Sequence, residues 1–536
     1  MKELISKAKT KESHAALLAF VFAVIVFLFS WHSDDAYHSY VMARNLVWGN
    51  GLVYNIGYRV NASTCPLFTL LEALFYLVIR NMELASSLLS TISCYITAYI
   101  LFKKCCKNLL YSLLAFAGML ICYSFMSFTA SGLENPLLFM FGVMFLSEYA
   151  QNEYYNKKHL FIIALLTSLL AMTRMDIVLI FIPMILYMYL LKTKVKFIHR
   201  VFIGLAGLLP FISWCLFSLF YYGFIFPNTF YAKLNVNIPA SEFIQRGISY
   251  LGFSFAYDLM LLLVPLSLIV LTIRYRNKKT LILITGMLLY YVYVVSIGGD
   301  FMVGRHLTVP FFLSLCSLFL LINTITDNKK ENLYIYSYVG ILVICLILNM
   351  SLSKLIKKYF YGSTNNAAIT CAADEREFYV SSGLDTLSIL SCQFNNQDLN
   401  MVAADEFYFN LIDSLRNKGY KGLALEDTTF YGVIIYYAQD RSDTPFYVTD
   451  DHGLMDAFVV RLPNTDNNNW RTGHIQRQFP AGFQETISSG ANVIEDPNLH
   501  EYYDHMNLIT AGDLFSSERI NTIIDMNTGR YDYLLN

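Results

Sequence analysis

The sequence predicts an all-α polytopic membrane domain followed by a smaller domain of mixed α/β structure. The 536 residues are 56% hydrophobic and only 15% charged, with a mean hydropathy of +0.45. A soluble enzyme carries about 25% charged residues. Apolar runs of roughly twenty residues, the length that crosses a bilayer, recur through residues 1–350. After these residues the content of asparagine, aspartate, threonine and glycine rises, and runs of that length cease.

About eleven segments are expected to cross the membrane as helices. The first follows a basic stretch with no small-residue cleavage site, so we interpret it as a retained signal anchor. The basic connectors all fall on the cytoplasmic side only if residues 66–80 do not cross. We therefore predict an interfacial or re-entrant helix at 66–80. The expected spans are residues 15–31, 84–102, 108–127, 134–150, 158–173, 176–191, 201–222, 251–273, 280–297, 307–326 and 332–350.

The chain is expected to divide into a membrane domain, 1–350, and a domain outside the cytoplasmic membrane, 351–536. Residues 32–83 form the first outer loop. Because the amino terminus is expected in the cytoplasm, an odd number of spans places the second domain on the outer side of the membrane. An oxidising compartment there allows a disulfide between Cys371 and Cys392, with two free thiols as the alternative. The ten cysteines show no metal-ligand spacing.

Short patterns indicate the secondary structure of this second domain. Residues 423–425, 432–437 and 446–449 are rich in β-prone side chains and favour strands, whereas residues 406–418 favour a helix.

The unusual polar residues gather in the loops expected on the outer side, beginning directly after the first span. Asp34 and Asp35 stand where that span ends, and charges at this depth are costly unless they face water, a cation or a ligand. An alternative is that Ser33, Asp34 or Asp35 caps a helix and that the arginines nearby are solvated at the interface. The same glycine-punctuated stretch continues with Tyr37, His38, Arg44 and Arg59. Carboxylates, a histidine and arginines together suit an anionic ligand and proton transfer.

The later outer loops carry further polar segments, whereas the inner connectors carry lysines and arginines. A transport path would need charges through the midplane and commonly shows repeat symmetry, and the sequence has no internal repeat. This one-sided pattern favours a site that faces outward. The segments are TASGLE at 129–134, TRMD at 173–176, YGFIFPNTFYAK at 222–233 and GGDFMVGR at 298–305.

These motifs resemble, in order along the chain, those of the GT-C glycosyltransferases related to the mycobacterial terminal arabinofuranosyltransferase AftB. The first is DDAYHSYVMARNLVWGNGLVYNIGYRVNASTCPLFTLL, which begins at residue 34. The others are SGLENPL at 131–137, TRMD at 173–176, FPNTFYAKL at 226–234, GGDFMVGRHLTVP at 298–310 and the stretch from DDHGLMDAF to QFPAGF at 450–483. The resemblance spans nearly the whole chain.

The resemblance implies an enzyme of the bacterial cytoplasmic membrane whose active site faces the periplasm. The donor would be a sugar on a polyprenyl phosphate, and the acceptor a glycan or glycolipid of the cell envelope. No nucleotide sugar is implied, and the chain has no glycine-rich phosphate loop. No partner of nucleic-acid type is expected, because the net charge is −1.

The resemblance also implies roles for individual residues. Asp34 would be the catalytic base, and Asp35 would orient it, contact the sugar or help to hold a divalent cation. The candidates for binding the donor phosphate are, in order of preference, Arg59, Arg305, Lys233, Arg174 and Arg44. The candidates for contacting the sugar or the acceptor are Tyr37, His38, Glu134, Asn228, Tyr231, Asp300, Asp451 and His474. The structural alternatives are contacts with lipid headgroups for the arginines, a helix N-terminus for Glu134, a loop cap for Asn228 and a turn for Asp300.

Three other functions remain open at this stage. One is a hexosyl- or aminoarabinosyl-transferase that acts on lipopolysaccharide or protein. The others are a lipid or glycan transporter and a non-catalytic carbohydrate-binding membrane protein, which would tolerate loss of Asp34 with no change in product.

Overall fold

The protein is described here from a computed structural model, in which the chain forms two compact units that alternate along the sequence. The first unit comprises Met1–Trp31, Ser86–Phe211 and Pro239–Phe378, and the second His32–Ala85, Ile212–Ile238 and Tyr379–Asn536. The structure describes residues 2–232, 238–360, 372–381, 386, 403–426, 431–440, 445–464, 470, 472–473 and 475–535.

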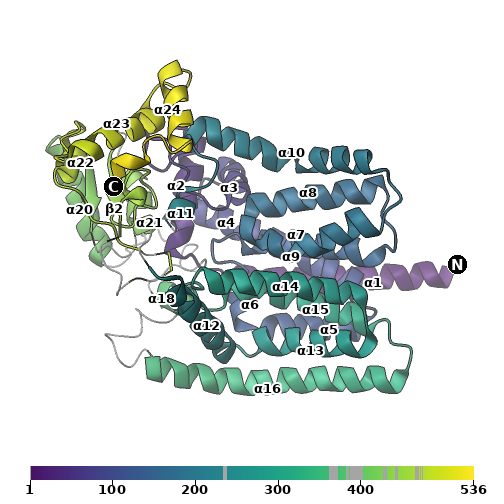
Figure 1. Ribbon diagram of the computed structural model, residues 1–536. Coiled ribbons are helices and arrows are strands. Elements are labelled where there is room, and N and C mark those ends of the chain that lie inside the picture. The colour runs from purple at the N-terminus through teal and green to yellow at the C-terminus, as the bar shows by residue number, and fades with distance from the viewer. Residues whose placement is uncertain are drawn as a thin grey trace. The chain divides into compact units, whose positions relative to one another are not determined.

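The first unit is built from helices, several of which lie side by side with their axes roughly aligned (Figure 1). α9 packs against α14, α13 against α15, and α7 against both α8 and α15. The elements are α1 (Lys2–Leu28), α4 (Met82–Ile100, which begins in the second unit), η1 (Leu101–Cys105), α5 (Leu109–Ile121), α6 (Tyr123–Ser127), α7 (Asn135–Gln151), α8 (Lys157–Thr173), η2 (Met175–Ile177), α9 (Val178–Leu186), η3 (Tyr187–Leu191), α10 (Phe197–Tyr222, which ends in the second unit), α12 (Ala240–Tyr257), α13 (Met260–Tyr275), α14 (Lys278–Ser296), η4 (Arg305–Leu307), α15 (Thr308–Ile322), α16 (Asn328–Phe360) and α18 (Glu375–Ser381).

Six helical segments in the described residues are long and apolar enough to cross a membrane, or seven if the bent pair α12–α13 counts as one span. They are Thr10–Leu28, Met82–Cys105, Phe197–Tyr222, Lys278–Ser296, Arg305–Ile322 and Asn328–Asn349. The chain is therefore a multi-pass membrane protein, as its composition predicts. The other expected spans correspond to shorter helices such as α5, α7 and α8, so the count of eleven stays a prediction.

The expected span at 251–273 is not a single straight helix. The chain bends by 95° between α12 and α13. Asp258 lies at the break, where its carboxylate accepts hydrogen bonds from the backbone N–H groups of Met260 (3.1 Å) and Ser124 (2.8 Å). Asp258 is the C-cap residue of α12, and its carboxylate thus binds the first backbone N–H of α13 at the break between the two helices. The expected span at 108–127 is likewise interrupted, because α5 ends at Ile121 and α6 begins at Tyr123.

The second unit combines helices with two parallel strands. In the pairing of β1 with β2, Gly422 lies opposite Tyr447 and Leu425 opposite Asp450. The remaining elements are α2 (Asp34–Val47), α3 (Pro66–Ile79), α11 (Asn228–Tyr231), α20 (Ala403–Asn417), β1 (Gly422–Leu425), α21 (Tyr431–Asp440), β2 (Tyr447–Asp450), η5 (Val459–Arg461), α22 (Phe483–Ser489), α23 (Pro497–Ala511), α24 (Ser517–Asn527) and η6 (Asp532–Leu535).

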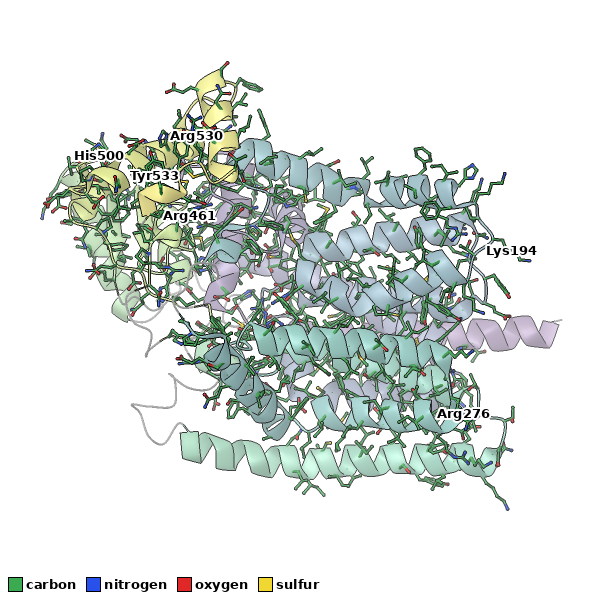
Figure 2. The ribbon with its side chains drawn as sticks, in the orientation of Figure 1. Lys194, Arg276, Arg461, His500, Arg530 and Tyr533 are labelled. Carbon is green, nitrogen blue, oxygen red and sulfur yellow. The ribbon has the colours of Figure 1, made fainter. Side chains whose placement is uncertain are left out.

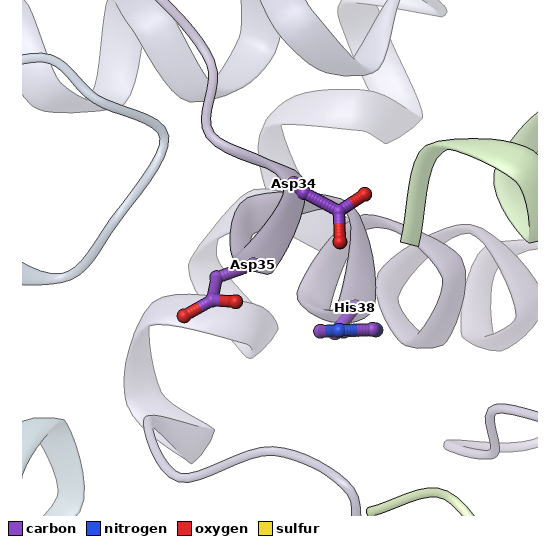
Figure 3. A group of neighbouring side chains, drawn as sticks. All are labelled: Asp34, Asp35 and His38. Atoms are coloured by element: carbon purple, nitrogen blue, oxygen red, sulfur yellow. The ribbon is translucent and has the colours of Figure 1, made fainter. Parts of the chain in front are cut away.

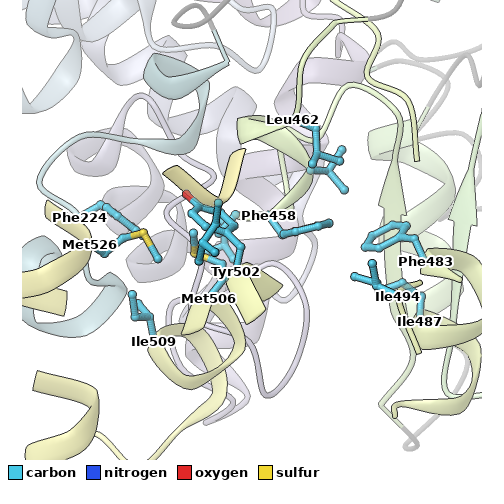
Figure 4. Packing of buried hydrophobic residues seen from close by; sticks show 14 of the residues in the cluster. Phe224, Phe458, Leu462, Phe483, Ile487, Ile494, Tyr502, Met506, Ile509 and Met526 are labelled. Atoms are coloured by element: carbon cyan, nitrogen blue, oxygen red, sulfur yellow. The ribbon is translucent and has the colours of Figure 1, made fainter. Parts of the chain in front are cut away.

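A hydrophobic core joins the three sequence segments of the second unit (Figure 4). Phe458 stacks on Phe483 with ring centroids 5.6 Å apart, and Ile509 and Phe224 belong to the same cluster. Val60 adds a residue from the expected first outer loop. Residues of the expected first outer loop therefore share a core with the carboxyl-terminal segment, and the domain boundary at residue 350 stays a prediction.

The expected strands at 423–425 and 446–449 overlap β1 and β2, and the expected helix at 406–418 overlaps α20. The prediction of a strand at 432–437 is wrong, because these residues lie in the helix α21. β-branched and aromatic side chains favour strands locally, but α21 packs against α2 and its first turn binds a carboxylate there, so tertiary contacts override that preference. The helix expected at 66–80 is present as α3.

Candidate functional site

The start of α2 brings two carboxylates and an imidazole together in the second unit (Figure 3). Asp34 and Asp35 occupy the first turn of the helix, and His38 follows one turn later. Residues four apart lie on the same helical face, so the spacing places His38 beside Asp34. One potential ligand atom from each of the three residues lies within 4.8 Å of the other two.

The carboxylate of Asp34 is held by the first turn of a second helix. It accepts hydrogen bonds from the backbone N–H groups of Val433 (2.9 Å) and Gly432 (3.2 Å) in α21. A Cβ atom on Gly432 would lie 2.5 Å from the backbone oxygen of Asp34, so only glycine permits this approach. Asp34 does not cap its own helix, because the N-cap position of α2 is Ser33. α21 therefore fixes the position of the Asp34 carboxylate.

Burial shifts the pKa values of Asp34 and His38 in opposite directions. Burial raises the pKa of Asp34 and the charge of Asp35 raises it further, whereas His38 and the two backbone N–H donors oppose the change. Burial lowers the pKa of His38, against the influence of Asp34 and Asp450. A carboxyl group that holds its proton more tightly and an imidazole that releases it more easily suit proton transfer near neutral pH.

The same three side chains form a donor set that fits a divalent cation. Carboxylate oxygens and a neutral imidazole are ligands for Mg²⁺, Mn²⁺ or Zn²⁺. The lowered pKa of His38 favours the neutral ring that a metal ligand requires. A cation here would offset the repulsion between Asp34 and Asp35.

A carboxylate that the sequence analysis did not select lies near this cluster. Glu83, in the first turn of α4, accepts hydrogen bonds from the hydroxyl groups of Tyr437 (3.1 Å) and Tyr37 (3.4 Å). Arg44 places its guanidinium over the rings of Tyr436 (4.1 Å) and Trp48 (4.6 Å). An acidic residue at the start of an apolar helix is the signal that could have identified Glu83.

Three of the predicted residues form a second cluster, which lies in the first unit. Glu134 accepts hydrogen bonds from Arg174 (3.0 Å) and from Arg305 (3.1 and 3.2 Å). The three side chains come from the start of α7, the end of α8 and the start of η4. Burial alone would raise the pKa of Glu134, but the guanidinium groups of Arg305 and Arg174 lower it below its usual value. Glu134 is therefore an ionised, buried partner of two arginines.

Further charges extend this ion-pair network. Asp176 accepts a hydrogen bond from Arg174 at 2.9 Å, and Asp300 lies 3.9 Å from Arg305 and 3.6 Å from the ring of His306. The carboxylates of Glu134, Asp176 and Asp300 thus surround the guanidinium groups of Arg174 and Arg305 and the ring of His306. His306 was not among the residues predicted from the sequence. Because the arginines are already compensated, this network as it stands is a poor site for a further anion.

The remaining predicted residues of the second unit make structural contacts. Arg59 donates hydrogen bonds to Thr510 (2.9 Å, from its backbone N–H) and to the carbonyl of Gly512, at the end of α23. The Asn228 amide donates to three carbonyls of the loop 453–456, as a loop cap does. Tyr231 packs on Phe224. Asp451 lies 3.2 Å from the ring of His452. Lys233, His474, Cys371 and Cys392 lie outside the described residues.

The structure thus brings some of the predicted residues into two clusters, one in each unit. Together the fold and these clusters define a helical, multi-pass membrane protein with two carboxylates and an imidazole gathered at the start of α2. Comparison of the chain with protein-family models, curated proteins and solved structures finds no match in any of the three.

Proposed function

We propose that the chain is an integral membrane glycosyltransferase of the GT-C type. It transfers a sugar, a pentose such as arabinofuranose, from a polyprenyl-phosphate donor to a glycan or glycolipid of the bacterial cell envelope. The observation that carries the proposal is the Asp34–Asp35–His38 cluster, in which a carboxylate of raised pKa is held in place beside an imidazole. The order of the sequence motifs supports the same class.

In the proposed reaction, Asp34 removes the proton from the acceptor hydroxyl group. The acceptor oxygen forms a bond to the anomeric carbon, and the bond from that carbon to the phosphate oxygen breaks. The electron pair of the broken bond leaves with the polyprenyl phosphate. His38 can take the proton on from Asp34, and Asp35 orients its neighbour or shares a cation with it.

Purified protein tests the reaction directly. Polyprenyl-phosphate arabinofuranose and an envelope glycan are expected to give a glycan extended by one pentose, measured by mass spectrometry. Glycans of a strain that lacks the gene should lose the same terminal sugar. Extension only with a hexose or aminoarabinose donor would move the proposal to another sugar, and no extension with any lipid-linked donor would reject the class.

We assign the leaving phosphate to Arg59 in the first instance. Within the described residues Arg59 forms no ion pair, whereas Arg174 and Arg305 are compensated by carboxylates. Arg59→Ala is expected to weaken binding of the donor by about 1.5–3 kcal/mol, the scale of a charge-assisted hydrogen bond. Titration of the donor into purified protein measures this change.

Arg59→Lys provides the matched comparison, because it keeps the charge but loses the guanidinium fork, and it should recover only part of the affinity. Thermal unfolding of both variants is needed, since Arg59 also binds the carbonyl of Gly512. Unchanged donor affinity in folded Arg59→Ala protein would transfer the phosphate role to Arg305 or Lys233.

The proposal includes eleven spans, with the carboxyl-terminal segment outside the cytoplasmic membrane. Glu518 is exposed in α24, so Glu518→Cys is expected to react with a membrane-impermeant thiol reagent in intact spheroplasts. Lys330→Cys, in a basic connector, should react only after lysis. Seven of the eight described cysteines are buried and Cys215 is half-buried, and the unsubstituted protein, which also carries Cys371 and Cys392, gives the background labelling to subtract. The opposite pattern would invert the topology beyond residue 80.

A further inference from the structure

An open pocket lies between two connectors of the first unit, and none of the residues of the two carboxylate clusters lines it. Its volume is about 530 Å³, and it lies between the connector that precedes α8 and the one that precedes α10. Three lysines, Lys157, Lys194 and Lys196, line it together with His199. The described lining includes no carboxylate. The pocket is therefore strongly basic.

The backbone that carries these lysines is held by hydrogen bonds between the two connectors. The N–H of Tyr155 donates to the carbonyl of Lys192 at 2.9 Å, and the hydroxyl of Thr193 donates to the carbonyl of Tyr155 at 2.6 Å. Arg200 donates to the carbonyl of Val195 at 2.6 Å. The cationic side chains thus project from a fixed frame.

The positive charge of the pocket is not compensated by the protein. Across the part of the chain that the structure describes, Lys157, Lys194 and Lys196 form no ion pair, and Lys194 lies 5.9 Å from the ring of Tyr154. Glu153 is the nearest carboxylate in sequence and does not line the pocket. The amino termini of α8 and α10 border the site, and their helix dipoles add to its attraction for an anion.

The surface beside the pocket is apolar and exposed. Leu191 is 73% exposed, and Phe197 and Phe202 in α10 are 68% and 64% exposed. The candidate span Phe197–Tyr222 has an 18-residue stretch with a mean hydropathy of 2.0, of which only 17% is buried within the protein. Such a helix presents its side to lipid chains, so the pocket opens at the end of a lipid-facing span.

We propose that this pocket binds the phosphate of an anionic phospholipid headgroup, with the acyl chains lying along the exposed face of α10. Basic pockets at the ends of membrane helices bind such headgroups, and each lysine adds to the attraction. Figure 2 shows Lys194 at the same end of the first unit as Arg276, in another basic connector. This clustering favours a lipid of the cytoplasmic leaflet. The site is separate from the proposed transferase centre and does not depend on it.

The test compares two charge-matched double variants of the full chain. Association of fluorescent phosphatidylglycerol with the purified protein in neutral detergent is measured by anisotropy, with phosphatidylcholine as the zwitterionic comparison. Lys194→Gln with Lys196→Gln is expected to reduce binding of phosphatidylglycerol about tenfold. Lys329→Gln with Lys330→Gln, in another connector, removes the same charge and should leave binding unchanged.

Replacing Lys194 and Lys196 by arginine keeps the charge and is expected to retain binding, which separates loss of the site from loss of folding. Equal losses in the two glutamine variants, or equal binding of the two lipids by the wild-type protein, would overturn the proposal. Displacement of the lipid by millimolar inorganic phosphate alone would also overturn it, because the pocket would then be a site for free phosphate.

Discussion

Asp34→Asn is expected to reduce sugar transfer at least about a hundredfold, the low end for loss of a positioned general base. The amide keeps the size of the side chain and an oxygen that can accept from the N–H of Val433, and it loses the hydrogen bond from Gly432, at a cost of about 1 kcal/mol. Folding and donor binding should therefore survive. The measurement is the rate of pentose transfer by purified variant and wild-type proteins at equal donor occupancy.

Asp496→Asn is the matched control. Asp496 accepts hydrogen bonds from two backbone N–H groups, those of Asn498 and Leu499 (both 2.9 Å), at the start of α23. Asp496 caps its own helix and does not belong to the Asp34–Asp35–His38 cluster, so its replacement should leave transfer near the wild-type rate. Near-normal transfer by folded Asp34→Asn protein would remove Asp34 from the chemistry and make Glu134 the next carboxylate to test.

The pH dependence gives the base a second signature. Burial raises the pKa of Asp34 above its ordinary value of 3.8, and a base loses activity as the pH falls through its pKa. The acid limb of the rate profile should therefore lie at a higher pH than that of an ordinary aspartate.

Replacement of Asp35 distinguishes its two proposed roles. If Asp35 shares a cation with Asp34, Asp35→Asn should reduce transfer as much as Asp34→Asn does, and a chelator should inhibit transfer. If it only orients Asp34, the loss should be smaller and a chelator without effect.

Glu134→Ala is expected to lower the free energy of unfolding by about 3–5 kcal/mol, the cost of leaving buried charges without their partner. The Glu134 side chain is only 2% exposed and bridges Arg174 and Arg305. Without it, Arg174 would rely on Asp176 and Arg305 on the more distant Asp300, 3.9 Å away. Thermal and denaturant unfolding in detergent measures the change.

Glu153→Ala is the comparison for this variant, because Glu153 is an exposed carboxylate of the same unit and its removal should change stability by less than about 0.5 kcal/mol. The contribution of Glu134 to the free energy of unfolding depends on pH with a definite sign. The arginines lower the pKa of Glu134, so its stabilising contribution is complete above the ordinary value of 4.5 and is lost as the pH falls toward the lowered pKa. Equal stability of both variants would show that the network contributes little.

Features that depend on neighbours along the chain could be predicted from the sequence. The helical membrane character follows from apolar composition and run length. The four-residue spacing of Asp34 and His38 places them on one face of α2, and the helix at 66–80 follows from its own apolar pattern. These features need only local periodicity, which a single segment carries within itself.

The contacts between distant segments could not be predicted in this way, because they arise from the packing of the helices. Gly432 and Val433 bind Asp34 across about four hundred residues, and the same docking makes a helix of residues that locally favour a strand. Glu134 meets Arg174 and Arg305 because three separate helix ends converge. A residue's spacing along the chain does not encode which distant partner will compensate its charge, since that choice depends on how the helices pack together.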